Sequence, residues 1–119
     1  MRKRIMIVDD DPAMRGMLRD ILESGGHAVV AEAANGDEAF SDYKELLPDI
    51  VIMDIVIPSK NGLEVTRLIH SVDSGARIII LSALSDIPLI KAAFASGATD
   101  YIHKPFTPAR MLEAIQQAG

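Results

Sequence analysis

Five polar side chains that could do chemistry together lie at the ends of apolar, strand-like runs. They are Asp9, Asp10, Asp54, Ser82 and Lys104. The runs that precede them are Ile5–Val8, Ile50–Met53, Ile78–Leu81 and Tyr101–Ile102. Helix-like stretches separate the runs, so we expect parallel strands, whose carboxyl ends meet at one edge of the sheet. The sequence therefore predicts one pocket that holds carboxylates, a hydroxyl and an amine.

The carboxylates of Asp9, Asp10 and Asp54 favour a divalent cation in this pocket. Two carboxylates about 4 Å apart repel by roughly 4 kcal/mol at an effective dielectric constant of 20, so a cluster either raises a pKa or binds a cation. Oxygen ligands without a cluster of His or Cys suit Mg²⁺, which keeps several waters and often bridges to a phosphate. A structural Zn²⁺ site does not fit this donor set.

The same pocket could accept a phosphoryl group. A cation together with Lys104 would offset the negative charge of the carboxylates. The hydroxyl of Ser82 could donate a hydrogen bond to a phosphoryl oxygen. An aspartate that acts as nucleophile in such a site forms an acyl phosphate.

Length and charge limit the possible classes of protein. A chain of 119 residues is expected to form a single domain over residues 1–119. Its 12 basic against 17 acidic residues give a net charge of −5, which disfavours direct binding of nucleic acid. No apolar run is long enough for membrane insertion, and the stretch after the basic start ends at Asp9, too short for a signal peptide. We therefore expect a cytoplasmic protein.

Capping residues mark the starts of helices between the strands. The caps are Asp11, Asn35, Asn61 and Thr107. A further strand is expected at Ala28–Ala33. The first helix should turn an apolar face that includes Met17 toward the core, and the fourth should turn Ile87, Ile90, Ala93 and Phe94 inward. The alternation predicts five βα units in an α/β, doubly wound fold.

Four segments carry motifs that are typical of a known family. They are Ile5–Pro12, Asp54 with Pro58 and Gly62, Leu81–Ala83, and Gly97–Phe106. Together they resemble the receiver domain of two-component response regulators, of the stand-alone type seen in the chemotaxis regulator, over essentially the whole chain. The resemblance implies a three-layer, flavodoxin-like (βα)5 sandwich with a five-stranded parallel sheet of order 2-1-3-4-5. It also implies a cis peptide bond before Pro105.

The resemblance implies a role for each residue of the acceptor site. Asp54 would accept the phosphoryl group. Asp10 and Asp54 would bind Mg²⁺ through their carboxylates, together with the backbone carbonyl of Val56, and Asp9 would act through a metal-bound water. Lys104 would pair with the phosphoryl oxygens.

The resemblance also implies a switch and partners. Ser82 would be drawn to the phosphoryl group, and Tyr101 would turn inward into the space that Ser82 leaves, which alters the face of the fourth helix, fifth strand and fifth helix. The phosphoryl donor would be the phosphohistidine of a sensor histidine kinase or phosphotransfer protein, and the output partner is unknown. The protein would be no enzyme beyond its own phosphorylation and dephosphorylation, and a monomer or a weak, phosphorylation-linked dimer.

Three other functions are open at this point. A Mg²⁺-dependent phosphohydrolase usually has a second acidic residue two positions after its nucleophile, where this chain has Val56. A flavodoxin-like cofactor binder would need a loop rich in Gly and hydroxyl residues after the first strand, where this chain has Asp9–Pro12. An interaction module that is never phosphorylated would not need the acceptor-site residues, which are all present.

Two aliphatic side chains suggest how long the phosphoryl group would last. Val56 and Leu84 stand where some members of the family place polar side chains that assist the hydrolytic water. We hypothesise slow self-dephosphorylation.

Overall fold

Five parallel strands alternate with five helices in this computed structural model, which describes residues 2–119. The strands are β1 (Arg4–Val8), β2 (Ala28–Ala33), β3 (Ile50–Met53), β4 (Ile78–Ser82) and β5 (Asp100–His103). The helices are α1 (Pro12–Ser24), α2 (Gly36–Leu46), α3 (Gly62–Val72), α4 (Ile87–Ala95) and α5 (Pro108–Ala118). The strand order β2-β1-β3-β4-β5 confirms the predicted sheet.

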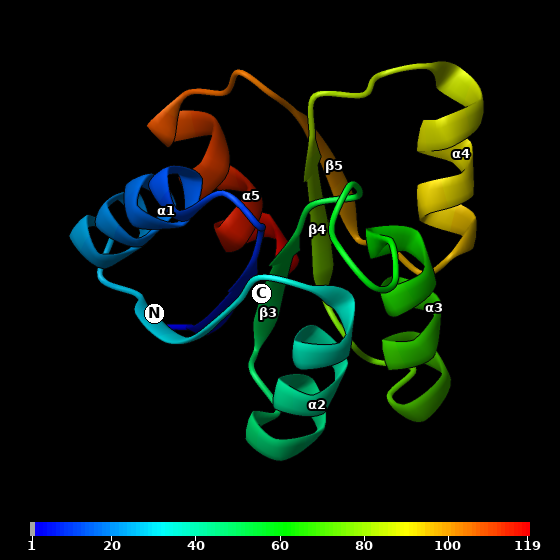
Figure 1. Ribbon diagram of the computed structural model, residues 1–119. Coiled ribbons are helices and arrows are strands. Elements are labelled where there is room, and N and C mark those ends of the chain that lie inside the picture. The colour runs from blue at the N-terminus through cyan, green and yellow to red at the C-terminus, as the bar shows by residue number, and fades with distance from the viewer. Residues whose placement is uncertain (1) are drawn as a thin grey trace.

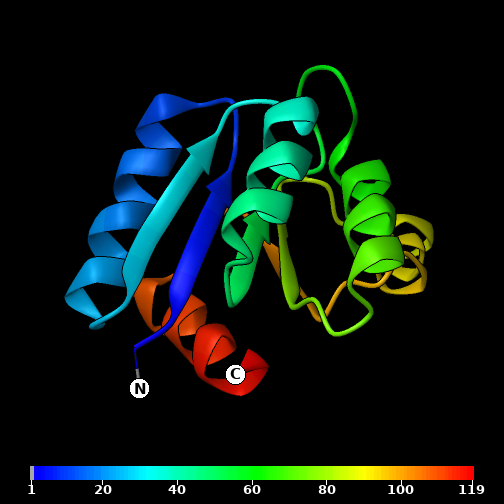
Figure 2. The same ribbon diagram turned by 90° about the horizontal axis from the view of Figure 1, so that it is seen from below.

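The helices cover both faces of the sheet. Figure 1 shows α1 and α5 on one side of the strands and α2, α3 and α4 on the other, and the view from below in Figure 2 shows the same division. This is the expected three-layer arrangement. Within residues 2–119, no helix is long and apolar enough to cross a membrane.

Alternate residues of each central strand enter opposite halves of the core. In β1, Ile5 and Ile7 pack with side chains of α1 and α5, whereas Met6 and Val8 pack with side chains of α2, α3 and α4. All four side chains are at most 1% exposed. A strand that is buried on both faces needs apolar residues at every position, which explains the unbroken runs in the sequence. Each such side chain stabilises the fold by about 1.5–3 kcal/mol.

The predicted helix caps are confirmed by their hydrogen bonds. The side chains of Asn35 and Asn61 accept from the backbone N–H groups of Glu38 and Glu64, at 2.9 Å in both cases. Asp11 and Thr107 likewise cap α1 and α5. A cap of this kind contributes about 1 kcal/mol, and here the caps fix where each helix begins relative to the strand before it.

The apolar faces of two helices differ from the prediction. Met17 in α1 is 45% exposed, and Ile87 and Phe94 in α4 are 67% and 46% exposed. In α4 the inward positions are Leu89 and Ala93, which share one stripe four residues apart. The sequence of α4 is apolar on almost every side, so its pattern does not tell which face packs on the sheet.

The loop between β3 and α3, residues 54–61, begins with Asp54 and is held at its end by Gly62. The N–H of Gly62 donates to the carbonyl of Ile55 at 2.7 Å. A Cβ at Gly62 would lie 2.0 Å from the carbonyl oxygen of Asp54. Only glycine allows the start of α3 to lie this close to the peptide group between Asp54 and Ile55.

The middle of the same loop contacts the start of α2. The N–H of Gly36 donates to the carbonyl of Pro58 at 3.0 Å, and the N–H of Asp37 donates to Ser59 Oγ at 3.1 Å. Lys60 Nζ lies 2.5 Å from Asp37 Oδ1. The loop therefore contacts the first residues of both α2 and α3.

Replacing Gly62 with alanine should destabilise the protein by about 1–3 kcal/mol, because the added methyl group forces the loop away from Asp54. Urea unfolding followed by circular dichroism measures this change. The matched control is Gly16→Ala, since a Cβ at Gly16 meets no atom within 4 Å. In the interior of α1 that change should stabilise the helix by up to about 1 kcal/mol. Equal effects of the two variants would contradict the tight packing at Gly62.

Candidate functional site

Three carboxylates converge at the carboxyl ends of β1 and β3, which are neighbours in the sheet. Oxygen atoms of Asp9, Asp10 and Asp54 all lie within 4.8 Å of one another. Asp9 and Asp54 are only 2% and 9% exposed, whereas Asp10 is open to solvent. This confirms the predicted convergence. An all-oxygen donor set with one open side is suited to a hard divalent cation that keeps some of its water.

Lys104 reaches into the cluster from the end of β5. Its Nζ lies 3.0 Å from Asp9 Oδ2 and 3.3 Å from Asp54 Oδ2. The peptide bond between Lys104 and Pro105 is cis, as predicted. The backbone N–H of Lys104 donates to the carbonyl of Ser82 at 2.8 Å, which joins β5 to the end of β4 at this edge.

Burial and charge act against each other in this site. Burial raises the pKa of the Asp54 carboxyl, and the charge of Asp9 adds to the rise, although Lys104 and the N–H of Ile55 oppose it. Burial works to lower the pKa of Lys104, but the hydrogen bond to Asp9 and the charges of Asp54 and Asp9 outweigh it and leave that pKa above its ordinary value. The lysine is therefore held as a cation among carboxylates that repel one another.

Backbone groups fix one oxygen of each buried carboxylate. The N–H of Asp11 donates to Asp9 Oδ1 at 2.9 Å, and the N–H of Ile55 donates to Asp54 Oδ1 at 2.7 Å. The second oxygen of each carboxylate is the one that contacts Lys104. The Lys104 ammonium group therefore contacts the Oδ2 atoms, while backbone N–H groups contact the Oδ1 atoms.

Ser82 and Tyr101 lie at the same edge, and both contact the backbone of Leu84. Ser82 is 1% exposed, and its Oγ accepts the N–H of Leu84 at 3.1 Å. The hydroxyl of Tyr101 donates to the carbonyl of Leu84, and its ring packs against the core. The two side chains expected to act as the switch therefore meet at Leu84, in the loop between β4 and α4, and the Tyr101 hydroxyl also interacts directly with Ser82. The role of the Val56 carbonyl stays a prediction.

Two further side chains contact the backbone of the site without any signal in their type or spacing. Arg15 in α1 donates from Nη1 to the carbonyl of Asp9 at 2.6 Å. His103, interpreted from the sequence only as the end of a strand, places Nε2 at 3.0 Å from the carbonyl of Ala83. Both hold a backbone carbonyl, so neither contact could be read from a pattern of side chains.

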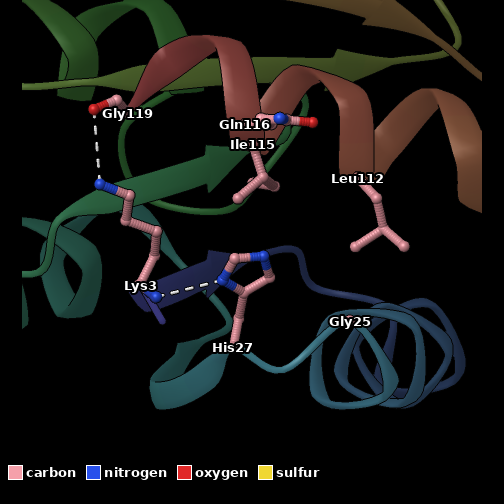
Figure 3. A pocket seen from close by; sticks show the side chains of 7 residues that line it. All are labelled: Lys3, Gly25, His27, Leu112, Ile115, Gln116 and Gly119. Atoms are coloured by element: carbon pink, nitrogen blue, oxygen red, sulfur yellow. Dashed lines mark hydrogen bonds between the residues drawn. The ribbon is translucent and has the colours of Figure 1, made fainter. Parts of the chain in front are cut away.

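A separate pocket of about 360 Å³ lies at the other end of the sheet (Figure 3). Its lining residues are Lys3, Gly25, His27, Leu112, Ile115, Gln116 and Gly119. None of these side chains is acidic. Burial, helped by the charge of Lys3, lowers the pKa of His27, whose Nδ1 accepts the N–H of Lys3 at 3.1 Å. This pocket offers no carboxylate side chain to a cation and is distinct from the acidic cluster.

Comparison with known families identifies the fold and the site together. The family model for the response regulator receiver domain matches residues 5–116. The chain belongs to the response regulator receiver family. Receivers are phospho-accepting signalling switches, not conventional enzymes, and the acidic cluster with Lys104 agrees with that activity.

Individual relatives resemble the chain along its length. The chemotaxis protein CheY of Thermotoga maritima is 46% identical over 119 residues, which cover 100% of this chain and 99% of that protein. The structure of a LuxR-family two-component response regulator from Aurantimonas sp. SI85-9A1 matches with a TM-score of 0.94 at 42% identity, covering 98% of this chain and 84% of that one. The CheX-CheY-BeF3-Mg²⁺ complex of Borrelia burgdorferi matches with a TM-score of 0.93 at 34% identity, covering 96% and 87%.

Replacing Asp54 with asparagine should raise the melting temperature of the metal-free receiver at pH 7 by a few °C, on the order expected for a gain of about 1 kcal/mol. The native pKa of Asp54 is raised, so the unfolded chain loses this proton more readily than the native state. Stability therefore falls as the pH rises above the ordinary range of a carboxyl group. The variant removes that loss, while Lys104 keeps its contact with Asp9. Thermal unfolding from pH 4 to pH 7 should show the gain growing with pH.

The second part of this experiment repeats the thermal unfolding of both proteins in the presence of Mg²⁺. At ten times its dissociation constant a cation that binds only the native state adds about 1.4 kcal/mol, so Mg²⁺ should raise the melting temperature of the wild type. The increase should be smaller in Asp54→Asn, because one of the three carboxylates is gone. An equal increase in both proteins would show that the cation binds elsewhere.

Proposed function

We propose that this receiver accepts a phosphoryl group on Asp54 from the phosphohistidine of a sensor histidine kinase or phosphotransfer protein. The observation that best supports this proposal is the cluster of three carboxylates, two of which contact the ammonium group of Lys104, at the carboxyl ends of the strands. Mg²⁺ fits this oxygen donor set, and we assign its ligands as Asp10, Asp54 and the Val56 carbonyl, with Asp9 acting through a metal-bound water. The relative solved in a complex with Mg²⁺ and BeF3 supports Mg²⁺ as the cation.

The transfer step is a substitution at phosphorus. An oxygen of the Asp54 carboxylate attacks the phosphorus and forms the acyl phosphate, and the bond from phosphorus to the donor imidazole breaks with its electron pair going to the nitrogen. Mg²⁺ held by Asp10, Asp54 and the Val56 carbonyl would supply positive charge that offsets the charge of the phosphoryl group. Lys104, whose Nζ contacts Asp9 and Asp54 in this structure, would pair with the phosphoryl oxygens and offset the added charge.

The phosphoryl group would act on the loop between β4 and α4. Ser82 Oγ accepts the N–H of Leu84 in this structure, and its hydroxyl proton would be free to donate to a phosphoryl oxygen. A hydrogen bond to this charged acceptor would draw Ser82 toward Asp54 and strain its contact with Leu84. Movement of Ser82 shifts Leu84, whose carbonyl holds the Tyr101 hydroxyl. The output surface in this proposal is the face of α4, β5 and α5, where Ile87 and Phe94 are exposed.

The partners follow from this chemistry in general terms. A kinase that takes its phosphoryl group from ATP would act on the receiver in the cytoplasm. The output partner would be a protein with an apolar surface that recognises the phosphorylated form of the α4-β5-α5 face. We expect a monomer, or a dimer that forms weakly on phosphorylation.

The first test is the intact mass after incubation with acetyl phosphate and Mg²⁺. The wild type should gain one phosphoryl group, and the gain should disappear in Asp54→Asn and when EDTA removes the metal. The control Asp20→Asn removes an exposed carboxylate of α1 and should leave the gain unchanged. A wild type that releases no phosphate and gains no mass despite bound Mg²⁺ would refute the proposal.

The aliphatic side chains next to the site should make the acyl phosphate long-lived. Val56 and Leu84 are 65% and 41% exposed, so both side chains can be exchanged without opening the core. Val56→Asn or Leu84→Asn should speed loss of phosphate several-fold, because an amide can orient the attacking water. The decay of the phosphorylated mass after removal of acetyl phosphate measures this rate. Unchanged decay in both variants would contradict the hypothesis of slow self-dephosphorylation.

A further inference from the structure

Arg15 makes two contacts that join the acidic cluster to the neighbouring strand. Its Nη1 donates to the carbonyl of Asp9 at 2.6 Å, and its Nε donates to Glu32 Oε1 at 3.2 Å. The Arg15 side chain is 19% exposed, so its guanidinium is largely shielded from water. Hydrogen bonds from a charged donor are stronger than neutral ones, and a planar guanidinium can serve two acceptors in fixed directions.

Glu32 is itself held in place on β2. Arg19 Nε and Nη2 lie 2.8 Å and 2.6 Å from Glu32 Oε2, so each oxygen of this carboxylate contacts a different arginine. Glu32 is therefore a fixed anchor for Arg15 and not a freely rotating surface group. These hydrogen bonds therefore join α1, β2 and the residue that follows β1 in one network.

The carbonyl that Arg15 holds belongs to the peptide unit between Asp9 and Asp10. The carboxylate of Asp9 has its own contacts with Asp11 and Lys104. Asp10 is exposed, so the direction of its carboxylate depends on the backbone that carries it. Holding this one peptide plane therefore constrains the backbone from which two of the three carboxylates of the cluster project.

We propose that Arg15 is a positioning residue for the cation site, with Glu32 as its anchor. This inference rests on the proposed binding of Mg²⁺ by the acidic cluster. Arg15 holds the backbone and not the metal, so it acts through Asp9 and Asp10. Partners that orient metal ligands in this way typically change metal affinity by about 10- to 100-fold when they are removed.

The positive charge of Arg15 makes the proposal sharply testable. As a charge alone, a guanidinium near the site repels a divalent cation, so its removal would tighten Mg²⁺ binding. As a positioning group it orders the ligands, so its removal would weaken Mg²⁺ binding. The two roles therefore predict changes of opposite sign.

The experiment is titration of the full chain with Mg²⁺ by isothermal calorimetry. Arg15→Gln should weaken binding by about tenfold or more. Arg15→Lys keeps the charge but cannot serve Asp9 and Glu32 in two fixed directions, so it should recover only part of the loss. Glu32→Gln should weaken binding less than Arg15→Gln. The control Arg77→Gln removes the same charge from an exposed position at the far end of β4 and should bind like the wild type.

Phosphorylation by acetyl phosphate separates positioning from a general loss of structure. In Arg15→Gln the Mg²⁺ concentration for half-maximal phosphorylation should rise, while the rate at saturating Mg²⁺ should stay near that of the wild type. All titrations are made below the metal-free melting temperature of the least stable variant. Should Arg15→Gln not fold, Arg15→Lys and Glu32→Gln carry the same comparison.

Two results would overturn the proposal, and they differ from each other. Mg²⁺ binding in Arg15→Gln that equals or exceeds that of the wild type would leave Arg15 as a charge without a positioning role, while the cation site itself stands. Failure of the wild type to bind Mg²⁺ would remove the proposed cation site and the positioning role with it.

Discussion

The repulsion among three carboxylates at one edge of the sheet is the constraint on which the other features of the site depend. Parallel strands bring Asp9, Asp10 and Asp54 within 4.8 Å of one another, and two of the three are almost fully buried. At such distances unscreened like charges oppose folding. The fold tolerates them because one oxygen of each buried carboxylate accepts a backbone N–H and the other contacts Lys104. The site is therefore held with excess negative charge, which a cation can relieve on binding.

Contacts to the surrounding backbone oppose this repulsion. Carboxylates that repel one another would move apart if their loops could move. Gly62 packs against the carbonyl of Asp54, the start of α2 holds the loop after it, and Arg15 holds the carbonyl of Asp9. These contacts come from three different helices and act on backbone atoms. They limit how far the carboxylates can move apart, so less ordering would remain to be done on binding of the proposed cation.

The parts that sequence could predict are those carried by periodicity and residue type. Apolar runs buried on both faces marked β1, β3 and β4, capping residues marked the helix starts, and polar residues after strands marked the site. In α4 the predicted inward position of Ala93 is confirmed, whereas those of Ile87 and Phe94 are wrong, because a short helix that is apolar nearly all round has no unique face. Arg15 and His103 were not assigned to the site, because each bonds a carbonyl whose position depends on the packing of other elements. Side-chain patterns carry no information about contacts to distant backbone atoms.

The free energy of the hydrogen bonds around Leu84 determines how large a conformational change this receiver can make without unfolding. Ser82, Tyr101 and His103 hold the loop between β4 and α4 through three hydrogen bonds, one of them to Ala83. Each is worth about 0.5–1.5 kcal/mol net, so exchanging two or three of them changes the free energy by about 1–4 kcal/mol. That amount shifts a two-state equilibrium by roughly five- to a thousand-fold, and it is smaller than the 5–15 kcal/mol that stabilise a typical domain. The loop can therefore change partners while the sheet and its core stay folded. Because these hydrogen bonds lie directly beside the last residues of β4 and β5, a new charge at Asp54 needs no long pathway to reach them.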